Sequence, residues 1–114
     1  MSDCLFCKII NRDIPATLIY EDGQLVAFQD IKPQAPMHIL IVPKRHIATL
    51  NDLTADDHDV IGRMVQRATI IANDQKYGHS GYRTVFNCNA DGGQTVFHIH
   101  LHLLGGRTMT WPPG

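Results

Sequence analysis

The sequence of 114 residues has no long apolar segment and almost no excess of either charge. Its longest aliphatic stretch, 39–42, has the length of a β-strand, whereas a membrane helix needs roughly 18 or more apolar residues. The formal net charge of −1 argues against a long nucleic-acid surface, because such surfaces are usually strongly basic. We therefore expect neither a membrane nor a nucleic-acid polymer as a partner, although backbone N–H groups could still hold a single phosphate.

Cysteine is also scarce, with only Cys4, Cys7 and Cys88 in the chain. An odd count, together with an N-terminus that lacks a basic and apolar leader, favours a reduced intracellular protein, and we expect it in the cytoplasm. With 44% hydrophobic residues, the whole chain, 1–114, is expected to fold as one domain around an ordinary core.

Hydrophobic periodicity predicts an α+β fold with an antiparallel sheet. The predicted elements are a short helix or turn at 4–10, strands at 17–21, 24–29, 38–43, 82–87 and 96–104 in meander-like order, a long helix at 55–76 and a loop at 89–93. The strand at 38–43 is expected to be central and buried on both faces. Asp22-Gly23 predicts a tight hairpin. A capping-box pattern at Thr54 and Asp57 predicts the start of the long helix, and Gly78 suits its C-terminus.

The most informative feature is a run of three histidines within five residues, His98, His100 and His102. Because side chains alternate along a strand, the three imidazoles are expected on one face and the intervening apolar residues on the other. The apolar set could pack against the long helix. The imidazoles would then be solvated, hydrogen-bonded or functional.

Three interpretations of the run stay open. A solvated histidine face is the first, and a metal site is the second, because two histidines at i and i+2 can share one zinc. All three histidines cannot easily do so, because i to i+4 spans roughly 13 Å along a strand. The third interpretation is covalent catalysis, in which a neutral imidazole attacks phosphorus. His100 is the natural nucleophile, since it has an imidazole on each side, and a backbone carbonyl that accepts its second N–H would fix its tautomer.

Further motifs surround the run. They are the segments 14–16, 28–31, 33–38, 43–47, 91–97, 104–107 and Trp-Pro-Pro-Gly at 111–114. Together with the pattern His-φ-His-φ-His-φ-φ, where φ is apolar, they resemble the histidine triad (HIT) superfamily over nearly the whole chain, and specifically its Hint branch of purine nucleoside phosphoramidases. The resemblance implies a HIT-like fold with a five-stranded sheet, one long helix and a short N-terminal helix, and a homodimer that joins two sheets.

The resemblance also implies an activity. It is hydrolysis of the P–N bond in AMP-type phosphoramidates, and of acyl or aminoacyl adenylates, through a covalent nucleotidyl-histidine intermediate. No cofactor is required for such catalysis. A nucleotide-binding regulatory module with incidental hydrolysis, a zinc-dependent hydrolase using His98 and His102, and a dinucleoside polyphosphate hydrolase stay open as alternatives. The Trp-Pro-Pro-Gly end favours the Hint branch over the last of these.

Residue roles follow from the same resemblance. His100 would be the nucleophile, the phosphate contacts would be Asn87, Gly93, Thr95 and His102, and the purine pocket would comprise Leu5, Phe6, Ile9, Phe28 and Ile31. Asp30 would hold the ribose hydroxyls, His38 would support the histidine cluster, and Trp111 would lie near a neighbouring subunit's site. Without the resemblance, Asp30 could be a turn residue, and Phe28 and Ile31 could be ordinary core. Thr95 departs from the serine of many Hint relatives, and its added methyl restricts χ1 while keeping the hydroxyl.

The segment from Cys4 to Cys7 is a CxxC motif, which alone indicates a zinc half-site, a redox pair or coincidence. A thioredoxin-like pair should lie near a βαβ pattern, and none is predicted. Some bacterial histidine triad proteins have a similar N-terminus and bind structural zinc through CxxC and two histidines. The resemblance then implies His46 and His98 as the remaining ligands of a Cys₂His₂ site, with zinc optional for the fold.

Overall fold

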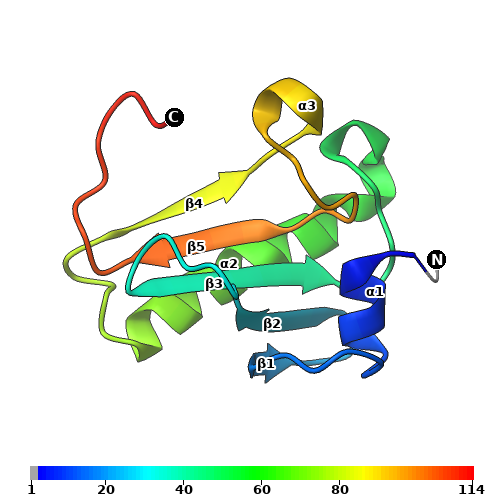
Figure 1. Cartoon of the computed structure of the whole chain (residues 1–114), viewed down its shortest axis with the longest axis horizontal. Coiled ribbons are helices and arrows are strands. Elements are labelled where there is room, and N and C mark those ends of the chain that lie inside the picture. Colours follow the sequence, from blue (N-terminus) through cyan, green and yellow to red (C-terminus); the bar gives the residue numbers. More distant parts are fainter. Residues whose placement is uncertain (1–2) are drawn as a thin grey trace.

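The computed structural model describes residues 3–114. Its elements are α1 (Leu5–Ile10), β1 (Leu18–Glu21), β2 (Leu25–Gln29), β3 (Met37–Pro43), two 3₁₀ turns at Leu50–Asp52 and Ala55–Asp57, α2 (His58–Asp74), β4 (Tyr82–Phe86), α3 (Asn89–Gly92) and β5 (Leu101–Gly105). The predicted α+β fold is confirmed, with five antiparallel strands, one long helix and a short N-terminal helix (Figure 1). None of these helices is long and apolar enough to cross a bilayer.

The strand order in the sheet is β1-β2-β3-β5-β4. The meander-like order is therefore wrong in its last step, because β5 lies between β3 and β4 and leaves β4 at the edge. Pairing of β5 with β3 is a long-range contact that local sequence patterns do not encode. The prediction for β3 is confirmed, since it is the central strand and all seven of its residues are buried.

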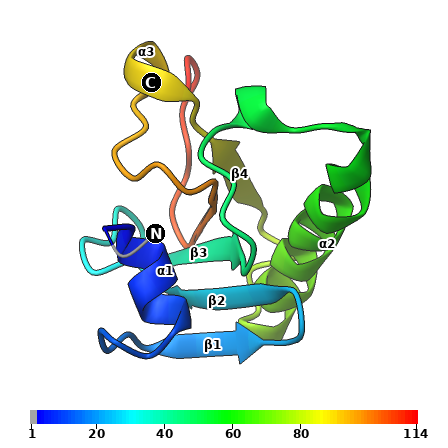
Figure 2. The same ribbon diagram turned by 90° about the vertical axis from the view of Figure 1, so that its right-hand side faces the viewer.

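Helices cover both faces of the sheet, which explains the burial of β3. Helix α2 lies along one face, and α1 lies on the opposite face (Figure 2). Side chains of β3 and β5 pack against α2 through Met64, Ala68, Ile71 and Ala72. On the other face, Phe6 and Ile9 of α1 pack on Phe28 and Leu40.

The hairpin and the helix start follow the sequence signals. The Asp22 carboxylate accepts hydrogen bonds from the backbone N–H groups of Gln24 and Leu25, at 2.7 and 2.8 Å, and closes the turn between β1 and β2. Both halves of the capping box between Thr54 and Asp57 are present, and the 3₁₀ turn at 55–57 leads into α2.

The end of the long helix differs from the prediction. Helix α2 ends at Asp74, and Lys76, with a φ of 70°, takes the left-handed conformation expected of Gly78. Gly78 instead lies close to α2. A Cβ there would lie 2.0 Å from the side-chain Oδ1 of Asn73, so a larger residue at this position would require the Asn73 side chain to move.

Two further boundaries are corrected. The expected loop at 89–93 contains the single-turn helix α3. The last strand begins at Leu101, not at residue 96, because the preceding segment bonds to a different part of the chain. There the Ile99 N–H donates to the Ile47 carbonyl at 2.7 Å. The alternation nevertheless persists, since Ile99 joins Leu101 and Leu103 in the core under α2.

Candidate active site

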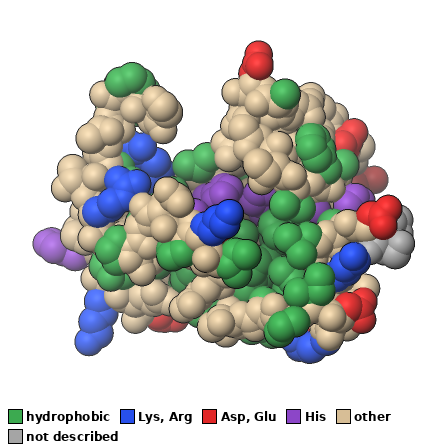
Figure 3. Space-filling view, viewed as in Figure 1, with side chains coloured by type: hydrophobic (Ala, Val, Ile, Leu, Met, Phe, Trp, Pro, Cys, Tyr) green, Lys and Arg blue, Asp and Glu red, His purple; other side chains and the backbone are tan. Residues whose placement is uncertain are grey.

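A cavity of about 340 Å³ opens between α1, the chain after β2 and the segment that leads into β5. Nine of the predicted site residues line it: Leu5, Phe6, Ile9, Phe28, Asp30, Ile31, Thr95, His100 and His102. Figure 3 shows apolar and histidine side chains side by side on this face of the molecule. The cavity therefore combines an apolar wall with imidazoles and one carboxylate.

Other residues that line the cavity were not predicted for the site. They are Ile14, Pro15, Ala16, Gln29, Lys32, Leu40 and Val96. The sequence gives little signal for them, because an apolar residue in a turn or strand looks the same whether it faces a core or a cavity. The 14–16 segment is one of the family motifs, but its spacing indicates no role in the site.

His100 is held as a neutral ring in one tautomer. Its Nδ1–H donates to the backbone carbonyl of His98 at 2.8 Å, so Nε2 of the neutral ring carries a lone pair. The ring is only 6% exposed, and Phe6 contacts it edge-on, with ring centroids 5.0 Å apart. Burial lowers the pKa of His100, against the opposing effects of the His98 carbonyl and Asp30. The carbonyl contact expected for the central histidine is present, and the ring is in the state that a nucleophile requires.

His38 and His102 form a second ordered pair. The backbone N–H of Gln34 donates to Nδ1 of His38 at 3.0 Å, and an N–H can only donate. Neutral His38 therefore carries its proton on Nε2 and donates it to Nδ1 of His102 at 2.9 Å. His102 must then carry its own proton on Nε2. The Asp30 carboxylate lies 3.5 Å from the His38 Nε2 and completes the group.

Burial also keeps this pair neutral. It lowers the pKa of His102 to about 4, and the neighbouring His100 and His38 act in the same direction, while Asp30 opposes them. The pKa of His38 is likewise lowered by burial and raised by Asp30. Although Asp30, His38 and His102 lie close enough to hold a metal ion, the Nε2 of His38 already carries a proton. The group therefore suits proton donation better than metal binding.

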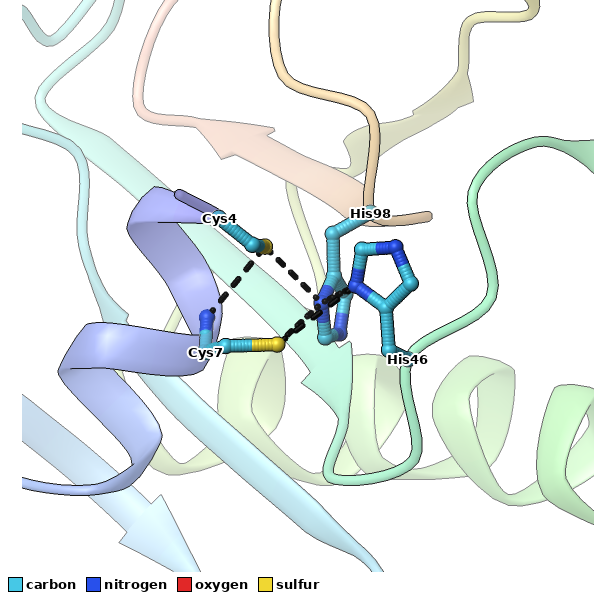
Figure 4. Close-up of side chains that lie close together, drawn as sticks. All are labelled: Cys4, Cys7, His46 and His98. Carbon is cyan, nitrogen blue, oxygen red and sulfur yellow. Dashed lines mark hydrogen bonds between the residues drawn. The ribbon is translucent and has the colours of Figure 1, made fainter. Parts of the chain in front are cut away.

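The CxxC motif, His46 and His98 form a compact cluster at the first turn of α1 (Figure 4). Nδ1 of His98 lies 3.4 Å from the Cys4 sulfur and 3.6 Å from the Cys7 sulfur. Nδ1 of His46 lies 3.4 Å from the Cys7 sulfur and 3.2 Å from Nδ1 of His98. Ligand atoms around a tetrahedral zinc are separated by roughly 3.3–3.8 Å, from bond lengths of about 2.0–2.3 Å. The four residues therefore fit a Cys₂His₂ zinc site.

The protonation of His98 supports this fit. Its Nε2–H donates to the Pro43 carbonyl at 2.7 Å, which leaves the Nδ1 lone pair directed at the cluster. The ring is fully buried, and burial lowers its pKa to about 4. A metal-binding histidine must be neutral with one unprotonated nitrogen, and His98 meets both conditions.

Three of the residues predicted to bind substrate do not line the cavity. Asn87 and Gly93 flank α3, and Trp111 is 82% exposed in the C-terminal segment. Sequence reasoning also missed Gln94, which is buried and fixes the chain before the histidines. Its Nε2 donates to the carbonyls of Ala48 and Val96, at 2.8 and 3.0 Å, and its Oε1 accepts from the Asn89 N–H. Gln94 lies within the 91–97 motif, but no local pattern predicts these hydrogen bonds.

Comparisons with known proteins agree with the geometry. Residues 3–111 match the family model described as scavenger mRNA decapping enzyme C-term binding. The purine nucleoside phosphoramidase of Escherichia coli K12 is 48% identical over 107 residues, which cover 94% of this chain and 90% of that protein.

Solved structures agree as well. A HIT family hydrolase from Legionella pneumophila has a TM-score of 0.97 and 56% identity, covering 98% of this chain and 100% of that one. A zinc-bound histidine triad family protein from Mycobacterium smegmatis has a TM-score of 0.81 and 31% identity, covering 99% and 81%. The chain therefore belongs to the histidine triad superfamily, in its Hint-like branch.

Proposed function

We propose that this HIT family hydrolase is a purine nucleoside phosphoramidase. It would cleave the P–N bond of AMP-type phosphoramidates, and also acyl and aminoacyl adenylates, through a nucleotidyl group held covalently on His100. The observation that carries the proposal is the tautomer of His100, whose unprotonated Nε2 belongs to a ring lining the cavity. The Escherichia coli relative that bears this name supports it.

Substrate binding would use the two kinds of cavity wall. The purine would lie among Leu5, Phe6, Ile9, Phe28 and Ile31. The ribose hydroxyls would donate to Asp30, since a carboxylate can accept two O–H groups. This arrangement would place the α-phosphorus near His100, which lines the same cavity.

The reaction would proceed in two displacements. Nε2 of His100 forms a bond to phosphorus while the P–N bond breaks, and the amine takes a proton from the solvent as it leaves, because an amide anion is a very poor leaving group. The Nε2–H of His102 and the Thr95 hydroxyl would donate to the phosphoryl oxygens. Water then attacks the phosphoimidazole and gives up a proton to the solvent, which releases the nucleoside monophosphate and restores neutral His100. Asn87 and Gly93 would complete the phosphate contacts if the α3 segment moves toward the cavity.

We also propose a structural zinc on Cys4, Cys7, His46 and His98. The ligand spacing and the free Nδ1 of His98 support it, as does the zinc-bound relative from Mycobacterium smegmatis. The metal would tie the start of α1 to the segment before β5 and would take no part in bond cleavage. A homodimer, with Trp111 near the partner's cavity, is proposed from the family resemblance.

The deciding experiment is a panel of substrates with the purified wild-type protein. Adenosine 5′-phosphoramidate, lysyl-AMP and a diadenosine polyphosphate are compared by kcat/KM. We expect turnover of the first two to exceed that of the polyphosphate. Preference for the polyphosphate would assign the protein to dinucleoside polyphosphate hydrolysis. Background rates on all three, with nucleotide binding retained, would indicate a regulatory binding module.

A further inference from the structure

We propose that Arg107 is a positioning residue that fixes the proton of His102 on Nε2, acting through Gln34 and His38. Its effect on turnover rests on the function proposed above, whereas its effect on the proton does not. Arg107 follows β5 and lies outside the residues that line the cavity. It therefore acts at a distance from the substrate.

The first link joins the chain after β5 to the loop before β3. The Arg107 Nε–H donates to the Gln34 carbonyl at 2.8 Å, and its Nη1 donates to the Thr108 carbonyl at 3.3 Å. The guanidinium thus ties its own segment to the loop. Only the Nε–H reaches the Gln34 carbonyl, so a single hydrogen bond holds this part of the loop.

Gly106 allows the same two segments to lie close together. Its φ is +95°, and a Cβ at this position would lie 2.8 Å from Cβ of Pro36 in the same loop. Only glycine lets the two segments approach so closely in this conformation. Gly106 and Arg107 therefore brace one loop by two independent contacts, one steric and one hydrogen-bonded.

The second link passes from this loop to the histidines. Gln34, whose carbonyl is held by Arg107, points its N–H at Nδ1 of His38. That donor forces the His38 proton onto Nε2 and toward His102. Arg107 is thus connected to His102 through the backbone of Gln34, and each of the three hydrogen bonds has only one direction.

Loss of the brace would change what His102 offers the substrate. If Gln34 moves away, His38 can carry its proton on Nδ1 and accept from His102 instead. His102 would then direct a lone pair, not a proton, at the phosphate or the leaving group. A negatively charged phosphoryl oxygen is repelled by that lone pair, so turnover should fall more than substrate binding does.

The experiment reads the proton directly. Long-range ¹H–¹⁵N correlation of the imidazole nitrogens assigns the tautomer of His102 in the wild-type protein and in Arg107→Met, which keeps the aliphatic stem. Wild-type His102 should be the Nε2–H form, and the variant should show a mixture. With adenosine 5′-phosphoramidate, kcat should fall about ten-fold, a fraction of a general acid's full effect, while KM changes little.

Two further variants sharpen the comparison. Arg107→Lys keeps one donor. Its fraction of the Nε2–H form of His102 and its kcat should therefore both lie between those of the wild type and Arg107→Met. Arg63→Met removes an exposed arginine of α2, which pairs with Asp59, and should leave both unchanged. A wild-type His102 in the Nδ1–H form would overturn the proposal, as would an unchanged tautomer in Arg107→Met, whatever its kcat. If the wild-type protein turns over no phosphoramidate, the proposed function fails while the tautomer result still decides this inference.

Discussion

Nδ1 of His100 and the backbone carbonyl of His98 are joined by a hydrogen bond of 2.8 Å, which leaves Nε2 of His100 as the only basic nitrogen of that ring. His100→Ala should therefore lower kcat with adenosine 5′-phosphoramidate by at least about a thousand-fold, as loss of a nucleophile does elsewhere. Nucleotide affinity should change little, because the apolar wall stays. Steady-state kinetics and calorimetric titration with AMP measure the two effects. His79→Ala, an exposed histidine after α2, serves as the control, and substantial residual turnover in His100→Ala would refute the assignment.

Asp30 offers a test of ribose recognition. Its Oδ1 already accepts from the Lys32 N–H at 2.7 Å, so Asp30→Asn keeps a turn acceptor while removing the charge. Wild-type enzyme should discriminate against a 2′-deoxy substrate, and the variant should discriminate roughly ten-fold less, since hydrogen bonds to a charged group contribute about 1.5–3 kcal/mol. The ratio of kcat/KM for the two substrates is the measurement. If the kcat/KM ratio is the same in both proteins, Asp30 does not bind the ribose and serves only as a turn residue.

Among the described residues that line the cavity, Thr95 carries the only aliphatic hydroxyl group. Thr95→Val preserves the shape but removes the donor, and kcat should fall about ten- to a hundred-fold. Thr95→Ser should stay within a few-fold of the wild type, because the hydroxyl remains and χ1 only becomes less restricted. If valine and serine behave alike, the hydroxyl does not contact the phosphate.

Zinc binding can be tested by metal analysis of protein purified without a histidine tag. We expect about one zinc per chain, as for a complete Cys₂His₂ site, and loss of most of it in Cys7→Ala. Cys88→Ala is the matched control, because that thiol lies outside the cluster. Thermal unfolding should show a lower Tm for Cys7→Ala and not for Cys88→Ala. Less than about 0.2 zinc per wild-type chain would contradict the site.

The burial of His102 should make the free energy of unfolding depend on pH. Its pKa is about 4 in the folded chain, against about 6.5 when unfolded, because burial disfavours the charged ring. As the pH falls from about 6.5 to 4, the unfolded chain gains a proton that the folded chain lacks, so the free energy of unfolding decreases. Above that window His102 has no effect. Urea unfolding of the wild type and His102→Gln measures this, and the variant should lose less stability on acidification; parallel curves would contradict it.

Short-range sequence patterns predict much of the fold. The alternation of residues 98–103 predicted which side chains face α2, and it holds even where the chain is not a strand. Capping at Thr54 and Asp57 and the turn at Asp22 depend on neighbours within a few residues, so the sequence contains the whole interaction. The cavity residues came mainly from family motifs, and nine of those predicted do line one cavity.

The missed features depend on contacts between distant segments. The place of β5 between β3 and β4, and its late start at Leu101, are set by partners about 60 residues away. Gly78 is predicted to end the long helix because glycine favours the left-handed conformation, but Lys76 adopts that conformation instead. The role of the buried Gln94 is not predicted for the same reason as the place of β5, since its partner Ala48 lies 46 positions away in the sequence. The tautomer of His38 can likewise be inferred only from the structure, because it depends on the Gln34 N–H that lies beside the ring.

His98 takes part in two arrangements through different atoms. Its ring belongs to the sulfur and nitrogen cluster, while its main-chain oxygen orients the ring of His100. Mutation can replace the ring, but every residue type supplies the same oxygen. A lineage of this fold can therefore lose the side chains of the cluster one at a time and still inherit an aligned His100, provided that the backbone between Ile47 and Leu101 keeps its course.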